Sequence, residues 1–159
     1  MRVLYAQRVA VLLFAASIAA PPVSASLLTD LPGRWSGQGS IKMSNGNSEQ
    51  LKCVATYFVA EGGSSLQQHL RCASVSYKID STASLQVNSG RVSGEWHEKI
   101  YLVDGSVAGR ITDNGFNLAI HAENFSAAMS VTTSMCKQSL SITPRGYDIS
   151  EISMTLGKC

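Results

Sequence analysis

The chain has 159 residues, with 13 Lys and Arg against 11 Asp and Glu and no run of basic residues. Its first 25 residues contain Arg2 and Arg8 but no acidic residue, so the rest of the chain carries no formal net charge. A neutral chain without a basic patch lacks the electrostatic signature of a protein that binds nucleic acid or an anionic membrane surface.

The N-terminal segment has the three parts of an export signal. Arg2 and Arg8 come before an apolar run at 9–20. This run is shorter than the ~20 residues that a membrane-spanning helix needs. Small residues at Val23 and Ala25 then fit a cleavage site after residue 25. A retained membrane anchor is the alternative interpretation, and the shortness of the apolar run disfavours it.

Cleavage would leave residues 26–159, a length typical of one domain with a substantial core. We therefore expect a signal peptide at 1–25 and a single β-barrel domain at 26–159, the latter periplasmic or secreted and without a membrane span.

All four cysteines, Cys53, Cys72, Cys136 and Cys159, follow the apolar run. An even number of cysteines in an exported chain predicts two disulfides. Metal ligation by these cysteines is the alternative, but the chain has no CxxC motif.

The local sequence favours one cysteine pairing. Cys53 and Cys72 are equidistant from Gly62-Gly63, so a hairpin turn at this glycine pair would place them opposite each other, within the Cα separation that a disulfide tolerates. The same register opposes Val59 to Leu66 on an apolar face. A bridge between Cys136 and Cys159 then follows by elimination.

Apolar and polar residues alternate along most of the chain after residue 25, as in strands with one buried face. No stretch there has the periodicity of a helix. The alternating segments lie at 51–59, 75–79, 83–87, 107–111, 116–120, 125–131 and 140–142. The turn signals that separate them are Asn45-Gly46-Asn47, Gly62-Gly63, Asn88-Ser89-Gly90, Asp104-Gly105, Asp113-Asn114-Gly115 and Pro144-Arg145-Gly146.

A short pattern of Gly, any residue, an apolar residue, a small residue and Gly recurs at 33–37, 90–94 and 105–109. Its second glycine would permit a bend or a close backbone approach, which a sheet needs to curl into a barrel. Coincidence in a chain rich in Gly and Ser is the alternative. We predict an all-β fold, an antiparallel up-and-down meander that closes into a disulfide-braced barrel of about eight to ten strands.

Leu31-Pro32-Gly33-Arg34-Trp35 resembles the G-x-W opening of lipocalin- and avidin-type barrels, the calycins. That resemblance implies that Trp35 closes the base of the barrel. A wider pattern resembles a group of small exported alphaproteobacterial proteins of unassigned function, which implies a bacterial periplasm. The biotin-binding residues of avidins are not recognisable, so the resemblance implies no ligand contacts. The wider pattern comprises 31–39, Arg71-Cys72-Ala73-Ser74, Gly94-Glu95-Trp96 and 105–109.

Histidines are the first candidates for chemistry. Glu95 and His97 would share a strand face, as would His121 and Glu123, and with His69 the three imidazoles would form a zinc site if they converged. Their spacing matches no zinc signature, and solvent-facing strand histidines are the more common case. We therefore predict no metal site.

Catalytic motifs are also lacking in the sequence. It contains no Gly-x-Ser-x-Gly elbow and no Gly-rich phosphate loop, and an oxidised cysteine cannot act as a nucleophile. Glu95 and Glu98 would suit a glycosidase pair, but solvated surface charges are far more common. We predict a protein that is not an enzyme and has no cofactor.

Aromatic residues suggest a pocket more readily than catalysis. Trp96, Tyr57, Tyr77 and Tyr101 are the candidate ligand contacts, with core packing as the alternative for each. Trp96 is the strongest candidate because Glu95, His97 and Glu98 place polar groups around it.

These features favour a non-catalytic barrel that binds a small apolar or amphipathic ligand. One alternative is a protein-binding module, such as an inhibitor of an exported protease or lysozyme, that uses its rim or loops. The other is a structural protein that associates with envelope proteins. A hollow interior favours the ligand carrier, whereas an interior filled with side chains favours binding through the loops.

Overall fold

The computed structural model describes residues 23–159, so the predicted signal peptide lies outside the described residues except for its last three positions. The described chain has a short helix α1 (Val23–Asp30), a 3-10 turn η1 (Glu61–Gly63) and ten strands. The strands are β1 (Gly33–Met43), β2 (Ser48–Val59), β3 (Ser65–Ala73), β4 (Lys78–Asn88), β5 (Arg91–Glu98), β6 (Val103–Ile111), β7 (Gly115–Ala122), β8 (Ser126–Ser134), β9 (Lys137–Arg145) and β10 (Ile149–Gly157).

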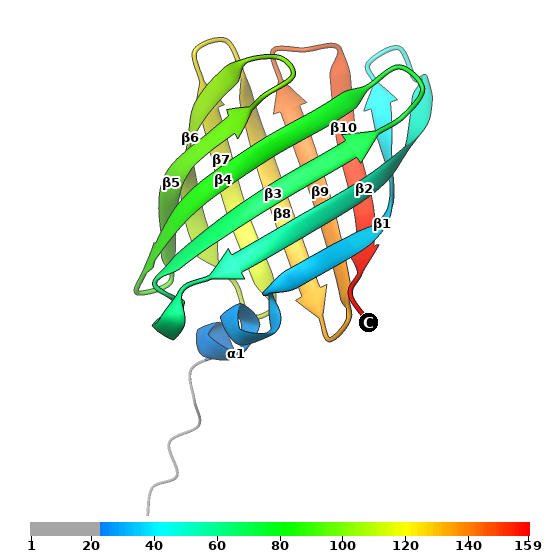
Figure 1. The fold of residues 1–159 in the computed structure, drawn as a ribbon. Coiled ribbons are helices and arrows are strands. Elements are labelled where there is room, and N and C mark those ends of the chain that lie inside the picture. Colours follow the sequence, from blue (N-terminus) through cyan, green and yellow to red (C-terminus); the bar gives the residue numbers. More distant parts are fainter. Residues whose placement is uncertain (1–22) are drawn as a thin grey trace, which may run out of the picture.

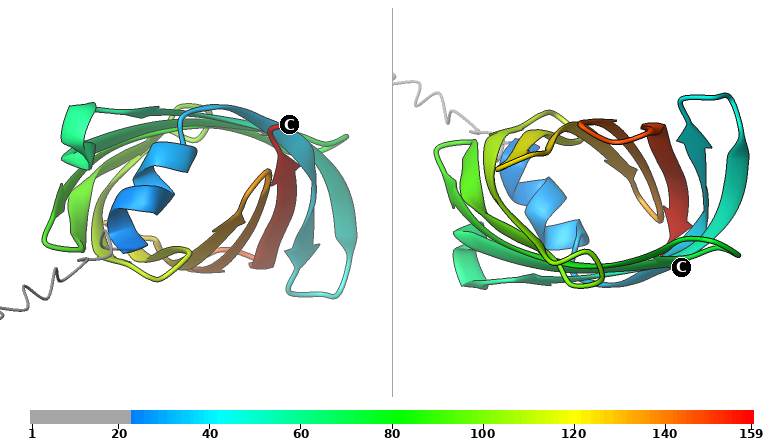
Figure 2. Two further views of the ribbon diagram at one scale, coloured as in Figure 1. Left: turned by 90° about the horizontal axis from the view of Figure 1, so that it is seen from below. Right: turned by 90° about the horizontal axis from the view of Figure 1, so that it is seen from above.

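The strands form one closed antiparallel barrel. Each strand from β1 to β10 pairs with the next one along the chain, and β1 also pairs with β10, which closes the sheet (Figure 1). Viewed along its axis, the barrel is flattened, and α1 lies across one of its two openings (Figure 2). This arrangement confirms the prediction of an all-β meander that closes into a barrel.

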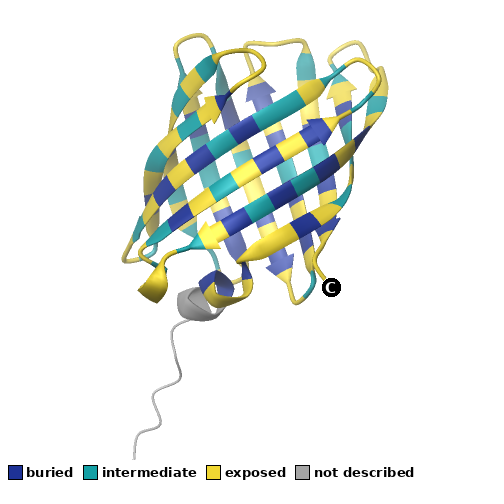
Figure 3. Ribbon diagram, viewed as in Figure 1, coloured by how far each residue is buried: buried dark blue, intermediate teal, exposed yellow. Residues whose placement is uncertain are grey.

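Burial follows the predicted alternation along the strands (Figure 3). In β2, Leu51, Cys53, Ala55 and Tyr57 are buried, while the residues between them face outward. Two residues per period place one set of side chains inside the barrel and the other in solvent. The core is therefore the barrel interior.

Both predicted disulfides are confirmed. Cys53 pairs with Cys72 in the register between β2 and β3, with their Cα atoms 4.1 Å apart, and the same register opposes Val59 to Leu66. Gly62, with φ of 75°, makes the intervening turn. The second disulfide joins Cys136 to Cys159 and attaches the end of β10 to the turn between β8 and β9.

The recurring glycine pattern marks close approaches between strands. A Cβ atom at Gly37, Gly94 or Gly109, the second glycine of each pattern, would collide with the carbonyl oxygen of a neighbouring strand. The colliding carbonyls belong to Thr155, Ser84 and Asn117 respectively. Glycine at these positions lets adjacent strands approach where the sheet curls.

The helix α1 differs from the prediction that no stretch after residue 25 is helical. Leu27, Leu28 and Leu31 are buried in the core cluster. All three follow the predicted cleavage site, so cleavage would leave this apolar cover attached to the barrel. The helix is too short for its periodicity to stand out from the adjoining apolar segment. Neither helical segment in residues 23–159 has the length and apolar character needed to cross a bilayer.

Trp35 closes the same end of the barrel, as the calycin resemblance implied. Its side chain is fully buried, and its indole Nε1 donates a hydrogen bond of 2.8 Å to the carbonyl oxygen of Leu31. The ammonium of Lys158 lies 5.0 Å from the centre of the Trp35 ring and also donates to the carbonyl oxygen of Asp30. We call this end, covered by α1, the base.

Two local predictions were wrong. Asp104-Gly105 is not a turn but lies inside β6, where Asp104 faces outward and Gly105 comes close to the backbone of His121. The turn lies earlier, between β5 and β6. Val75, predicted to begin a strand, is fully exposed in the loop before β4.

Candidate functional site

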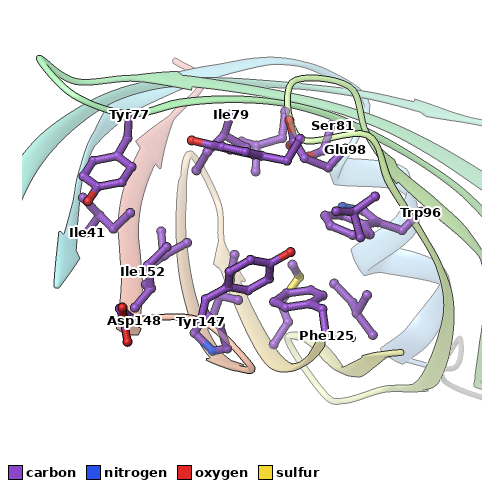
Figure 4. A pocket seen from close by; sticks show the side chains of 18 of the residues that line it. Ile41, Tyr77, Ile79, Ser81, Trp96, Glu98, Phe125, Tyr147, Asp148 and Ile152 are labelled. Carbon is purple, nitrogen blue, oxygen red and sulfur yellow. The ribbon is translucent and has the colours of Figure 1, made fainter. Parts of the chain in front are cut away.

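The half of the barrel opposite the base is hollow. A cavity of about 410 Å³ opens at this end, which we call the mouth, between the loops that join β1 to β2, β3 to β4, β5 to β6, β7 to β8 and β9 to β10 (Figure 4). Most of its lining is aliphatic or aromatic. The aliphatic side chains are Ile41, Met43, Leu70, Ile79, Val103, Ile120, Met129, Ile142, Pro144, Ile149 and Ile152.

Three aromatic rings lie one after another along one wall of the cavity. The Trp96 and Phe125 rings are stacked, with centroids 5.7 Å apart and an interplanar angle of 27°. Phe125 in turn lies 5.4 Å from Tyr147, with the rings tilted by 56°. Trp96 comes from β5, whereas the other two come from the mouth loops, so this wall extends from the interior to the opening.

Tyr77 lines another part of the mouth and is held by its loop. Its backbone N–H donates 2.9 Å to Ser74 Oγ, and the Ser74 N–H donates 2.9 Å to the Tyr77 carbonyl oxygen. Glu49 on β2 accepts hydrogen bonds from Ser74 Oγ at 2.6 Å and from the Ser76 N–H at 3.1 Å. These bonds lower the pKa of Glu49, and they fix the loop that presents Tyr77.

A hydrogen-bonded network forms part of the cavity floor. Tyr57 Oη donates 2.8 Å to Gln138 Oε1 and accepts a 2.9 Å bond from Gln68 Nε2, and Gln138 Nε2 donates 3.2 Å to Thr133 Oγ1. Gln68 also lines the cavity, whereas Gln138 is fully buried beneath it. Burial raises the pKa of Tyr57 to about 12, against the smaller opposing effect of the two glutamine hydrogen bonds.

Glu98 is the exception to this pattern of paired polar groups. It lies at the end of β5, is 5% exposed and lines the cavity beside Ser81. Its Oε1 accepts hydrogen bonds from the backbone N–H groups of Asp80 at 3.2 Å and Ile100 at 2.9 Å. Its Oε2 is buried and accepts no hydrogen bond, the one such side-chain atom found in the described part of the chain.

The charged groups of the lining are all acidic. Glu98 and Asp148 at the mouth are the carboxyl side chains of the described lining, and no Lys, Arg or His among the described residues lines the cavity. The lining can therefore accept hydrogen bonds and a positive charge more readily than it can receive an anion.

Three of the four aromatic residues selected from the sequence line the cavity: Trp96, Tyr77 and Tyr101. Tyr57 does not line it and instead lies beneath it in the floor network. The flanking polar residues that singled out Trp96 divide between the two faces of β5. Of these, Glu98 shares the inner face of Trp96, and Glu95 faces solvent.

The histidines lie on the outer surface. His97 Nδ1 lies 2.7 Å from Asp104 Oδ1 on β6, while its Nε2 is 3.9 Å from Glu95 Oε2. His69 and His121 are exposed on β3 and β7. In residues 23–159 no three His, Cys, Asp or Glu side chains gather as a metal site would require.

The rim of the mouth exposes apolar side chains. Val75 is 101% exposed and Leu102 is 86% exposed, and both occupy mouth loops together with Ile100, Tyr101 and Tyr147. Leu102 has a φ of 53°, in the left-handed region that a leucine seldom adopts. These side chains form an apolar surface around the opening, and its exposure to water is unfavourable.

Comparison with known proteins identifies the architecture but no family. No family model matches the chain, and no curated protein matches it either. Among solved structures, the chain is similar to the S-type phycobiliprotein lyase CPES from Guillardia theta, with a TM-score of 0.62 and 10% sequence identity. The similarity covers 84% of this chain and 91% of that lyase. At this identity the similarity is one of fold.

Proposed function

We propose that this protein is a non-catalytic carrier that binds a small apolar or amphipathic ligand inside its barrel. The observation that carries the proposal is the cavity of about 410 Å³ at the mouth, within the ~300–1,000 Å³ range of small-molecule sites. Trp96, Tyr77 and Tyr101 would contact the ligand, and the aliphatic walls would supply most of the binding energy. The similarity to a phycobiliprotein lyase supports the barrel architecture, and we do not extend the activity of that lyase to this chain.

The site of action that fits these features is the periplasm or the cell exterior. Two disulfides account for every cysteine of the chain, and disulfides persist in oxidising compartments. The export signal expected at residues 1–25 would deliver the protein there.

One observation favours a second candidate, a protein-binding module that acts through the mouth. The exposed apolar side chains of the rim, Val75 and Leu102 foremost, would be buried by a partner protein. In that case Val75→Asp with Leu102→Asp would abolish recovery of the partner and leave the affinity for a small apolar dye unchanged.

Native mass spectrometry of the protein purified from its own source tests the carrier function. We expect an excess mass of a few hundred daltons, which disappears on denaturation. For ligand-free protein, the neutral dye Nile red should bind saturably with enhanced fluorescence. The carrier proposal is rejected if the native mass equals the denatured mass and the dye does not bind.

A pair of variants locates the dye. Trp96→Ala should weaken Nile red binding about tenfold, because it removes a large aromatic surface from the cavity wall. Phe58→Ala is the matched control, because Phe58 is an aromatic residue exposed on the outer face of β2, and its loss should not alter binding. Equal effects of the two substitutions would place the dye outside the cavity.

A further inference from the structure

We infer that the ligand presents a protonated amine to Glu98, so that the cavity selects cationic amphiphiles and rejects anionic ones. This inference rests on the proposed carrier function and specifies the chemical class of the ligand. It starts from the buried Glu98 Oε2, which accepts no hydrogen bond from the described residues while its side chain lines the cavity.

The position of that oxygen is fixed by the other half of the carboxyl group. Oε1 accepts from two backbone N–H groups, those of Asp80 in β4 and of Ile100 in the loop that follows β5. With Oε1 held in this way, the Glu98 side chain cannot turn to satisfy Oε2 without losing one or both bonds. A buried carboxyl oxygen without a donor is costly, so a ligand donor that reaches it gains a strong, charge-assisted hydrogen bond.

The rest of the cavity agrees with a cationic head group. The charged side chains of the described lining are Glu98 and Asp148, both acidic, with no basic residue to receive a carboxylate, sulfate or phosphate. Trp96 shares the inner face of β5 with Glu98, and its stacked partner Phe125 extends the aromatic wall. A cation near such rings is also attracted by their electron-rich faces.

The geometry thus divides the cavity between a polar anchor and an apolar body site. The ammonium group would lie at Glu98, beside Ser81, and the hydrocarbon part would contact the aliphatic and aromatic walls (Figure 4). An anionic amphiphile of the same length would place its charge next to a buried carboxyl group, which is unfavourable at low dielectric.

Three probes with the same decyl chain test this assignment by isothermal titration calorimetry: decylamine, decyltrimethylammonium and decanoate. We expect decylamine to bind at least about tenfold more tightly than decanoate. Decyltrimethylammonium, which has the charge but no N–H donor, should bind between the two. Equal affinities for decylamine and decanoate would overturn the inference, and equal affinities for the two cations would overturn the hydrogen bond to Oε2.

Glu98→Gln tests the residue itself, because glutamine retains an Oε1 acceptor for the two backbone donors. We expect it to weaken decylamine binding about tenfold and to weaken binding of the neutral dye Nile red much less, by under about threefold, because the dye has no ammonium group for the carboxylate to bind. Asp148→Asn is the matched control: it removes the exposed acid at the mouth and should weaken decylamine binding less than about threefold, because water screens that charge. An equal loss in both variants would contradict the role of Glu98.

The outcomes separate this inference from the carrier function. Nile red binding without an amine preference would reject the ammonium ligand and retain the carrier. Failure of every probe to bind, the dye included, would reject both. If Glu98→Gln does not fold, the comparison of the three decyl probes on the unsubstituted protein still decides the inference.

Discussion

The base and the mouth of the barrel differ in whether their buried polar atoms have hydrogen-bond partners. Toward the base, Trp35 Nε1 has its carbonyl acceptor, and the floor network joins Tyr57, Gln68, Gln138 and Thr133 through three hydrogen bonds. At the mouth, Glu98 Oε2 is buried without a donor. Complete pairing is typical of a region that stabilises the fold, whereas the unpaired Glu98 Oε2 is the atom for which we propose a donor from the ligand.

The two ends also differ in whether their opening is covered. At the base, α1 and its buried leucines cover the opening, and the second disulfide attaches the C-terminus there. At the mouth, apolar side chains such as Leu102 remain exposed. In this barrel, therefore, one end is closed by packed side chains, whereas the other end is hollow and open.

The largest expected effect on the free energy of unfolding comes from replacing a tryptophan by alanine, and it should differ between the two ends. Trp35→Ala should lower the free energy of unfolding by about 3–5 kcal/mol, because it removes a fully buried ring and the bond to Leu31. Trp96→Ala should lower it by only about 1 kcal/mol, because the ring already borders a cavity and is partly exposed. Urea unfolding measures both values.

Ligand binding should respond in the opposite order. Under conditions where both variants are folded, Trp35→Ala should leave the Nile red dissociation constant unchanged, while Trp96→Ala raises it. Similar stability losses at the two positions would show that the ends are not specialised.

The disulfides give the next largest effect. Cys136→Ala with Cys159→Ala should lower the free energy of unfolding by about 3 kcal/mol, mainly by releasing a closed loop in the unfolded chain. Cys53→Ala with Cys72→Ala should cost a similar amount for the same reason, since the separations are 23 and 19 residues. Denaturant unfolding under non-reducing conditions gives both values.

Neither pair should alter the affinity for decylamine or Nile red, because no cysteine lines the cavity. A folded variant of either pair that no longer binds the dye would contradict the assignment of the disulfides to stability alone.

The sequence was informative where short-range geometry decides the structure. The glycine pair at 62–63 set the register that opposes Cys53 to Cys72, because a hairpin turn determines every pairing of its two strands. The same reasoning failed at Asp104-Gly105, where a turn-like dipeptide lies within β6. There the close approach of the His121 backbone, a tertiary contact, requires the glycine.

The cavity could not be predicted from local sequence patterns. Period-two alternation places Trp96 and Glu98 on one face of β5, so their shared orientation was available from the sequence. Alternation does not reveal how far along the axis each side chain lies, and for this reason Tyr57 was grouped with Tyr77 although it belongs to the floor. The pairing of Phe125 with Tyr147 depends on two loops far apart in sequence.

The floor network gives a smaller predicted effect than the disulfides, with a distinct dependence on pH. The unfolded chain releases the Tyr57 proton near the ordinary pKa of 10.0, whereas burial raises the pKa in the folded state to about 12. Between these values the folded state binds more protons, so the free energy of unfolding should fall as pH rises, by about 1.4 kcal/mol per pH unit. Below pH 9 Tyr57 should contribute no slope.

Tyr57→Phe isolates this contribution. It should cost about 1–3 kcal/mol at pH 7, because Gln138 Oε1 loses its donor and Gln68 Nε2 its acceptor. Urea unfolding at about pH 9 and pH 11 should then show a smaller loss of stability in the variant than in the unsubstituted protein, since the other tyrosines titrate in both and cancel. Parallel pH profiles for the two proteins would mean that Tyr57 is exposed to water, and the floor that separates the packed base from the hollow mouth would not be sealed there.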